Sequence, residues 1–132
     1  MVLKDKEEQI PQKNRTYRES FKFAFMGIRT AFHEERNMRV HVLSGVAVLL
    51  IGLVLPMTRA EWLWLILVSY LVFVMELINT VVENVVDLVT EEFHPIAKKV
   101  KDMAAAVVLV TATFAALVGA IILLPKILQI LM

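Results

Sequence analysis

Three apolar blocks, at residues 42–57, 62–82 and 104–124, limit most strongly what this chain of 132 residues can fold into. A helix of about 20 apolar residues crosses the hydrocarbon core of a bilayer. The second and third blocks reach this length, and the first reaches it if its helix begins near Arg39. A soluble protein with buried core helices is the alternative, but three such helices would leave too little polar surface to solvate them. We therefore expect an all-α integral membrane protein with a single domain over residues 1–132 and transmembrane helices at about 40–57, 62–88 and 102–124.

The basic residues are distributed unevenly around these blocks. Of the 14 lysines and arginines, all but Arg59 and Lys126 lie before the first block or between the second and the third. Loops rich in Lys and Arg stay in the cytoplasm. This predicts a multi-pass protein of the cytoplasmic membrane whose N-terminus and residues 90–103 face the cytoplasm. The net charge of +1 suggests no nucleic-acid partner, and the absence of Cys excludes disulfides, thiolate metal sites and cysteine nucleophiles.

Residues 17–38 form a second kind of segment, in which apolar and basic positions alternate with helical spacing. Its apolar positions are Phe21, Ala24, Phe25, Ile28, Ala31 and Phe32, with Arg18, Lys22 and Arg29 among the polar ones. This pattern is typical of an amphipathic helix that lies in the membrane interface. A helix packed on a soluble partner is the alternative. Residues 1–14 are expected to be a polar leader.

An acidic stripe interrupts the second apolar block. At about 100° per residue, Glu76, Asn79, Glu83 and Asp87 fall within a stripe roughly 80° wide on one helix face. An ionised carboxylate that faces lipid is costly, so these side chains should face protein, a cation or water. Glu76 and Glu83 are two turns apart, about 10 Å along the axis, which suits two separate tasks. One carboxylate could hold a hard cation while the other accepts a proton.

Further charged groups lie near the same membrane surface. HEERN at residues 33–37 supplies acids, Lys101 can bind a phosphate, and Asp102 can orient a neighbour. This collection suits phosphoryl transfer, in which catalysis is mostly positioning and charge neutralisation, and carboxylate ligands favour magnesium. Neither GxxxxGK[ST] nor GxGxxG occurs in the chain. A small proton-coupled transporter with Glu76 as the proton carrier, or a non-catalytic scaffold, remains an alternative.

ELINTVVENVVDLV, followed by EEFHPIAKKVKDMAAAVVLV, resembles the small bacterial membrane kinases that include diacylglycerol kinase and undecaprenol kinase. The resemblance covers roughly residues 18–125. Its hallmark positions are Glu76, Asn79, Thr80, Glu83, Asp87, Lys101 and Asp102. The resemblance implies an ATP-dependent lipid kinase and a homotrimer of three transmembrane helices plus a surface helix, with active sites shared between copies.

The resemblance also implies residue roles. Glu76 would be the general base, within a catalytic set of Glu76, Asn79 and Asp87. Glu35 and Glu83 would hold a Mg²⁺ ion that bridges the ATP phosphates. The remaining nucleotide contacts would be Phe23, Glu92, Phe93, His94, Lys101 and Asp102. The lipid alcohol would meet Arg29, Asn37 and Glu76.

Two positions depart from the Gram-negative diacylglycerol kinases, which carry tyrosine at the place of Phe23 and glutamate at the place of His41. Residues 35–37 together with His41 look instead like the Gram-positive branch, whose members resemble undecaprenol kinases. The predicted reaction is therefore phosphorylation of undecaprenol by ATP. The same chemistry on diacylglycerol is the close alternative.

Overall fold

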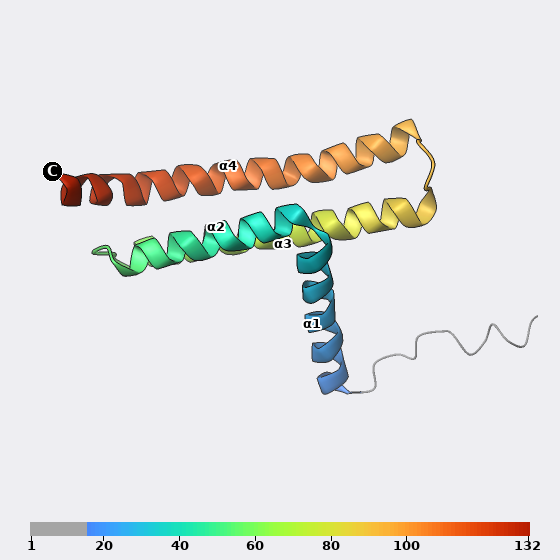
Figure 1. Cartoon of the computed structure of the whole chain (residues 1–132), viewed down its shortest axis with the longest axis horizontal. Coiled ribbons are helices and arrows are strands. Elements are labelled where there is room, and N and C mark those ends of the chain that lie inside the picture. Colours follow the sequence, from blue (N-terminus) through green and yellow to red (C-terminus); the bar gives the residue numbers. More distant parts are fainter. Residues whose placement is uncertain (1–15) are drawn as a thin grey trace, which may run out of the picture. The chain divides into compact units, whose positions relative to one another are not determined.

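A computed structural model describes residues 16–132, and this part of the chain is entirely helices and short connections (Figure 1). The helices are α1 (Tyr17–Glu34), α2 (Arg36–Leu53), α3 (Arg59–Val89) and α4 (Pro95–Leu131). The all-α class is thereby confirmed for these residues, while the predicted leader at residues 1–14 lies outside them. The chain divides into two units after Thr30, so the first part of α1 is described by itself and Ala31–Met132 as a second unit.

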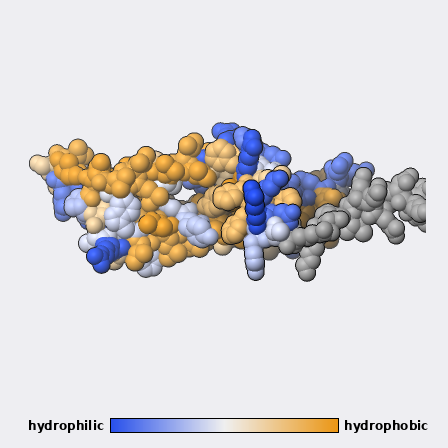
Figure 2. All heavy atoms as spheres, turned by 90° about the horizontal axis from the view of Figure 1, so that it is seen from below, coloured by the Kyte–Doolittle hydropathy of each residue, from blue (hydrophilic) through white to orange (hydrophobic). Residues whose placement is uncertain are grey.

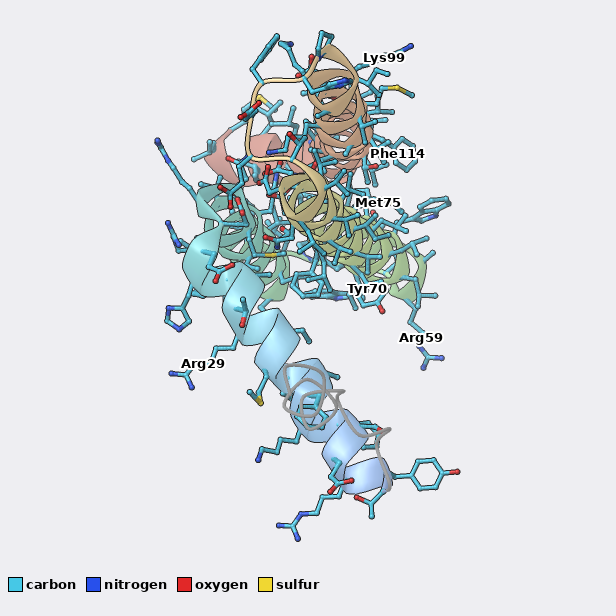
Figure 3. All side chains as sticks on the ribbon, turned by 90° about the vertical axis from the view of Figure 1, so that its right-hand side faces the viewer. Arg29, Arg59, Tyr70, Met75, Lys99 and Phe114 are labelled. Carbon is cyan, nitrogen blue, oxygen red and sulfur yellow. The ribbon has the colours of Figure 1, made fainter. Side chains whose placement is uncertain are left out.

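Within residues 16–132, three helices are long and apolar enough to cross a membrane, and they are α2, α3 and α4. Hydrophobic residues cover most of their length in the space-filling view (Figure 2). Many large apolar side chains are exposed, and Tyr70 and Phe114 project outward from α3 and α4 (Figure 3). Such exposure would be unfavourable in water, whereas a bilayer solvates it. The three predicted membrane-crossing helices are therefore present.

The first helix ends earlier than the segment 17–38 predicted for it. Glu35 has an extended backbone (φ −97°, ψ 119°) and separates α1 from α2. Arg39 Nη1 donates hydrogen bonds to the carbonyl oxygens of Phe32 (3.2 Å) and His33 (2.7 Å). These carbonyls at the end of α1 have no intrahelical donor, so the guanidinium of Arg39 satisfies them. The chain can thus turn at Glu35 with these two carbonyl oxygens hydrogen-bonded.

The connection between α2 and α3 is tight and well capped. Thr58 is the N-cap of α3, and it forms a capping box in which Glu61 N donates to Thr58 Oγ1 (3.3 Å) and Thr58 N donates to Glu61 Oε2 (2.7 Å). Lys126 of α4 reaches the same turn, where its Nζ lies 3.0 Å from Glu61 Oε1 and 2.7 Å from the carbonyl oxygen of Pro56. One lysine therefore ties the C-terminal part of α4 to the α2–α3 turn.

α4 is longer than the predicted span 102–124. It begins at Pro95, which needs no hydrogen-bond partner in the first turn, and His94 caps it by accepting from Ile96 N at Nδ1 (3.2 Å). At its other end α4 does not stop at Pro125, where the third apolar block was expected to close, but continues to Leu131. Proline removes a single intrahelical hydrogen bond there. The contacts of Lys126 hold the segment that follows.

α3 is the central helix of the second unit and packs against both α2 and α4. One stripe of α3 is buried, and it comprises Leu65, Val68, Val72, Glu76, Asn79 and Thr80. At the end near the α2–α3 turn, Leu65 joins Leu55 and Leu123 in a small apolar core. Farther along the same stripe the buried side chains become polar. The packing that buries Leu65 thus also encloses Glu76.

Candidate active site on the polar end of α3

Glu76 is the most enclosed charged side chain of the described part of the chain, with 1% of its surface exposed. Its Oε2 lies 4.0 Å from Nε2 of His41 on α2. Its Oε1 is buried and has no hydrogen-bond partner among residues 16–132. Buried polar atoms are nearly always paired, and an orphaned one marks a place where a ligand, water or ion belongs. The free oxygen of Glu76 is therefore available to accept a proton or a hydrogen bond from a substrate.

Asn79 and Glu83 form the next part of the site, one and two turns further along α3. Asn79 is buried, and its Nδ2 donates a 2.8 Å hydrogen bond to Oε1 of the half-buried Glu83. Among residues 16–132, the second carboxylate oxygen of Glu83 accepts no further hydrogen bond. Thr80 Oγ1 donates a hydrogen bond to the backbone carbonyl oxygen of Glu76 (3.0 Å), so its hydroxyl group is paired within α3. Asn79 thus orients Glu83 and is not hydrogen-bonded to the side chain of Glu76.

Glu35 lies at the break between α1 and α2. It and Glu83 are close enough to act on the Glu76 carboxylate by charge repulsion. The helix break therefore brings a third acid, far away in sequence, to the acidic stripe. Like charges around Glu76 favour a cation in their neighbourhood.

A second group of charges lies where α3 ends and α4 begins. Asp87 Oδ1 and Lys101 Nζ form an ion pair at 2.5 Å, and Lys98 pairs with Asp102 on α4. Asp87 and Asp102 are largely exposed, and Lys101 is about one-third exposed. Exposed pairs of this kind contribute little stability and exchange partners readily. Lys101 can therefore leave Asp87 for an incoming phosphate at small cost.

The other predicted site residues are not gathered by these contacts. Glu92, Phe93 and His94 lie exposed in the connection between α3 and α4, and the hydrogen bonds found there are local to that connection. Asn37 is exposed in the first turn of α2. Phe23 and Arg29 are exposed on the part of α1 that precedes Ala31 and are described with that unit alone.

The acidic groups do not by themselves form a closed metal cage. Within residues 16–132 no three His, Asp or Glu side chains are grouped closely enough to hold a metal ion. Mg²⁺ does not need such a cage, because it is commonly held by one or two carboxylates together with substrate phosphates and water. The carboxylate of Glu83, oriented by Asn79, fits this mode of binding.

His41 is the contact that sequence reasoning missed. It departs from the Gram-negative kinases but has no predicted role, and the structure places its Nε2 4.0 Å from Glu76 Oε2. A histidine within an apolar span is costly in lipid, and this cost was the available signal. Lys98 as the partner of Asp102 was also not foreseen, although the i,i+4 spacing allows it.

Comparison with known proteins identifies the family of the chain. The sequence model of the prokaryotic diacylglycerol kinase family matches residues 22–123. A diacylglycerol kinase from Synechocystis sp. is 42% identical over 85% of the chain, which covers 65% of that protein. An undecaprenol kinase from Bacillus subtilis is 37% identical over 92% of the chain and 98% of that protein. A diacylglycerol kinase from Escherichia coli is 32% identical over 76% of the chain and 83% of that protein. The chain therefore belongs to the prokaryotic diacylglycerol kinase family of membrane lipid kinases.

Proposed function

We propose that this protein phosphorylates the hydroxyl group of undecaprenol with ATP, giving undecaprenyl phosphate and ADP at the cytoplasmic face of the membrane. The observation that carries the proposal is the arrangement on α3, where a buried carboxylate with a free oxygen stands beside a second carboxylate oriented by an amide. Similarity to the Bacillus undecaprenol kinase over 98% of that protein supports undecaprenol as the substrate.

In the proposed reaction, the lipid hydroxyl oxygen attacks the γ-phosphorus of ATP and the bond to the ADP oxygen breaks. Glu76 accepts the hydroxyl proton at its unpartnered Oε1. A positioned base of this kind contributes typically 10²- to 10⁴-fold to the rate. Because Glu76 is enclosed and no residue of 16–132 donates a hydrogen bond to that oxygen, the oxygen can accept the proton of the substrate.

Mg²⁺ would be held by Glu83 and Glu35 and, when bound, would neutralise charge on the ATP phosphates. Asn79 fixes the orientation of Glu83 through its 2.8 Å hydrogen bond. The metal and the base then occupy different turns of α3, so that the cation does not neutralise Glu76.

The nucleotide would lie over the junction of α3 and α4. Lys101 binds phosphate after exchanging Asp87 for it, and Asp102 stays oriented by Lys98. The exposed residues Glu92, Phe93 and His94 border this region in sequence, and Phe23 completes the proposed nucleotide contacts.

α1 is proposed to lie in the cytoplasmic interface as an amphipathic helix. Its side chains Phe21 and Phe25 are 66% and 69% exposed, which leaves them free to enter lipid while Arg29 remains near phosphates. Arg29 and Asn37 would flank the lipid substrate. The working unit is proposed to be a homotrimer with shared active sites, for which the exposed apolar faces of α2, α3 and α4 offer contact area.

Diacylglycerol is the second candidate substrate. The Synechocystis, Helicobacter, Pseudomonas and Escherichia relatives are all named diacylglycerol kinases. Both lipids present a hydroxyl at the interface and apolar chains in the bilayer, so the base and metal positions serve either one. ATP turnover in mixed micelles that contain one lipid or the other distinguishes them, and a clear preference for diacylglycerol would refute the choice of undecaprenol.

The metal assignment is tested with Glu83→Gln, which keeps the shape of the side chain and removes its charge. We expect ATP-dependent lipid phosphorylation to be nearly abolished while subunit association is kept. Glu91→Gln is the matched control, because Glu91 is an exposed acid beyond the end of α3 and has no proposed role. Near-normal activity of Glu83→Gln would show that Glu83 does not hold the metal.

A further inference from the structure

The break between α1 and α2 occurs in a stretch of sequence whose local propensity is helical. No glycine or proline lies between Gly27 and Gly45, and glutamate is a good helix former. Nevertheless Glu35 has an extended backbone (φ −97°, ψ 119°), and its side chain forms no cap hydrogen bond at the start of α2. The break therefore depends on a contact made by another residue.

Arg39 makes this contact through its side chain. Its Nη1 donates to the carbonyl oxygens of Phe32 (3.2 Å) and His33 (2.7 Å). In an uninterrupted helix these two oxygens would accept hydrogen bonds from the backbone N–H groups of residues 36 and 37, four positions further along the chain. The guanidinium group thus replaces the two backbone donors that the break removes.

The residues on both sides of the break are also held in place. Ala31 and Met38 are buried, with 3% and 1% of their surface exposed. The backbone N–H of Glu35 donates to the carbonyl oxygen of Ala31 (3.0 Å), and the N–H of Arg39 donates to the carbonyl oxygen of Glu35 (3.4 Å). The side-chain bridge of Arg39 therefore decides the conformation of a short segment whose two ends are fixed.

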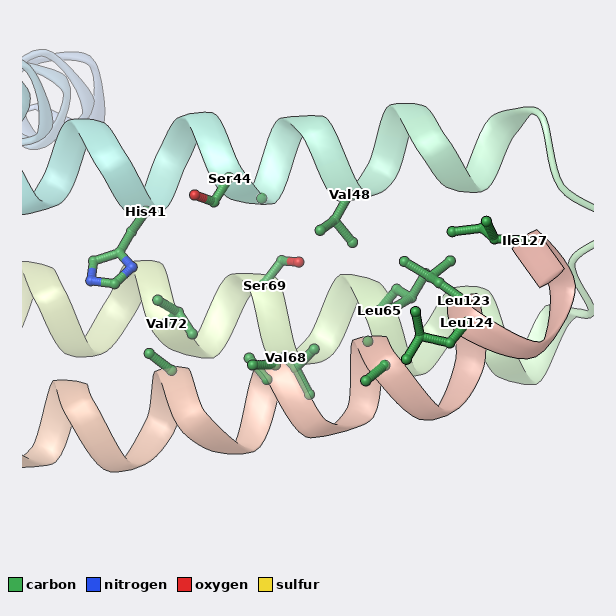
Figure 4. A pocket seen from close by; sticks show the side chains of 16 residues that line it. His41, Ser44, Val48, Leu65, Val68, Ser69, Val72, Leu123, Leu124 and Ile127 are labelled. Carbon is green, nitrogen blue, oxygen red and sulfur yellow. The ribbon is translucent and has the colours of Figure 1, made fainter. Parts of the chain in front are cut away.

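The conformation of the break matters because α2 packs on α3. Just after Arg39, His41 points from α2 toward α3 (Figure 4), and its Nε2 lies 4.0 Å from Glu76 Oε2. Glu35 is close enough to Glu76 for their carboxylates to repel each other. A change of the Glu35 backbone from extended to helical would turn its side chain in another direction while α2 stays packed on α3.

From these contacts, and resting on the proposed lipid kinase function with Glu35 as a ligand of Mg²⁺, we infer that Arg39 is a positioning residue for the metal ion. Arg39 acts through the backbone. Its bridge to Phe32 and His33 keeps the helix broken at Glu35, and the break presents the Glu35 carboxylate to the ion. Without the bridge, the last turn of α1 joins α2 in one helix and the carboxylate of Glu35 leaves the ion.

The first test is Arg39→Met, which removes both side-chain hydrogen bonds and keeps a long side chain. We expect the Mg²⁺ concentration for half-maximal lipid phosphorylation to rise roughly 10- to 100-fold, the range for residues that support a metal ligand. Much of the rate should return at saturating Mg²⁺. Arg39→Lys keeps a cationic donor and should stay near the unmodified protein. Arg36→Met is the matched control, because Arg36 is exposed in the first turn of α2 and has no proposed role.

Arg36→Pro provides a rescue that only a backbone role of Arg39 allows. Arg36 is the first residue of α2, where proline fits, and the extended backbone of Glu35 is of the kind that precedes proline. Proline has no N–H to offer the carbonyl of Phe32, so it prevents an uninterrupted helix. The double variant Arg36→Pro/Arg39→Met should therefore regain the Mg²⁺ dependence of the unmodified protein.

A double variant that needs as much Mg²⁺ as Arg39→Met would show that Arg39 does not act through the break, and the inference would be wrong. If Arg39→Met does not fold by itself, the double variant is compared with Arg36→Pro. A higher Mg²⁺ requirement of the double variant in that comparison would likewise overturn the inference.

Amide hydrogen exchange in detergent, measured by NMR without metal or ATP, reports on the break itself. Asn37 is the second residue of α2, so its N–H has no acceptor within the helix, whereas an uninterrupted helix would pair it with the carbonyl of His33. Exchange at Asn37 should slow by about tenfold or more in Arg39→Met and be fast again in the double variant. Unchanged exchange at Asn37 in Arg39→Met would contradict the inference at any level of activity.

Metal binding separates this inference from the proposed function. Binding of Mn²⁺ together with a non-hydrolysable ATP analogue, followed by electron paramagnetic resonance, should weaken in Arg39→Met and recover in the double variant. This result without phosphorylation of any lipid alcohol would overturn the proposed function alone. Lipid phosphorylation with the same Mg²⁺ dependence in Arg39→Met and the unmodified protein would overturn the inference alone.

Discussion

Asn79→Leu gives a quantitative test of how the acidic stripe is organised. Asn79 is 5% exposed, and its Nδ2 donates the 2.8 Å hydrogen bond that orients Glu83. Leucine removes this donor and also removes Oδ1, which is buried without a partner among the described residues. The free energy of unfolding should therefore change little, because one hydrogen bond and one unsatisfied acceptor disappear together.

The expected effect on Mg²⁺ is large by comparison. A hydrogen bond to a charged group contributes about 1.5–3 kcal/mol, and about 1.4 kcal/mol corresponds to a factor of ten. Loss of the bond should thus raise the Mg²⁺ concentration for half-maximal activity roughly 10- to 100-fold, the range seen when a residue behind a metal ligand is removed. At saturating Mg²⁺ much of the rate should return.

The assay is the initial rate of lipid phosphorylation over a Mg²⁺ titration, together with thermal unfolding in detergent with and without Mg²⁺. Asn84→Leu is the matched control, because Asn84 is exposed on the same helix. If the titration curves of Asn79→Leu and the unmodified protein coincide, Asn79 does not orient a metal ligand. A rate loss that no Mg²⁺ concentration restores would likewise contradict this reasoning.

Two further predictions concern the ends of the helices. Lys126 Nζ lies 3.0 Å from Glu61 Oε1, so a double-mutant cycle with Glu61→Gln and Lys126→Met should give a favourable coupling energy between the two side chains. Thermal unfolding in detergent measures this coupling energy. Purely additive effects of the two substitutions would show that Glu61 and Lys126 do not stabilise each other. Lys101→Met should raise KM for ATP roughly 10- to 100-fold, as expected for a lost charged contact to phosphate. Steady-state kinetics would contradict the phosphate role if KM for the lipid rose equally.

The membrane-crossing character of this protein follows from the sequence itself. Length and apolarity of residues 62–82 and 104–124 are sufficient for two spans, because a bilayer sets the length of a helix that crosses it. The shared face of Glu76, Asn79 and Glu83 follows from the helical period alone. The family pattern on α3 and α4 was likewise readable in order along the chain, and the family is confirmed.

Contacts between distant residues were not readable in this way. The break at Glu35 depends on Arg39 reaching the carbonyls of Phe32 and His33, and the passage of α4 through Pro125 accompanies the tie of Lys126 to Pro56. Local propensity does not include these bonds, because they join residues that meet only when the helices are assembled.

The acidic stripe shows most clearly which properties of the site follow from the sequence and which depend on the tertiary structure. Periodicity places Glu76, Glu83 and Asp87 on one face but treats them as equal. Packing of α2 and α4 on α3 makes them different, since Glu76 is 1% exposed beside His41 while Asp87 stays at the surface and pairs with Lys101. Burial and charge pairing depend on what lies opposite each side chain, and only the assembled helices determine that.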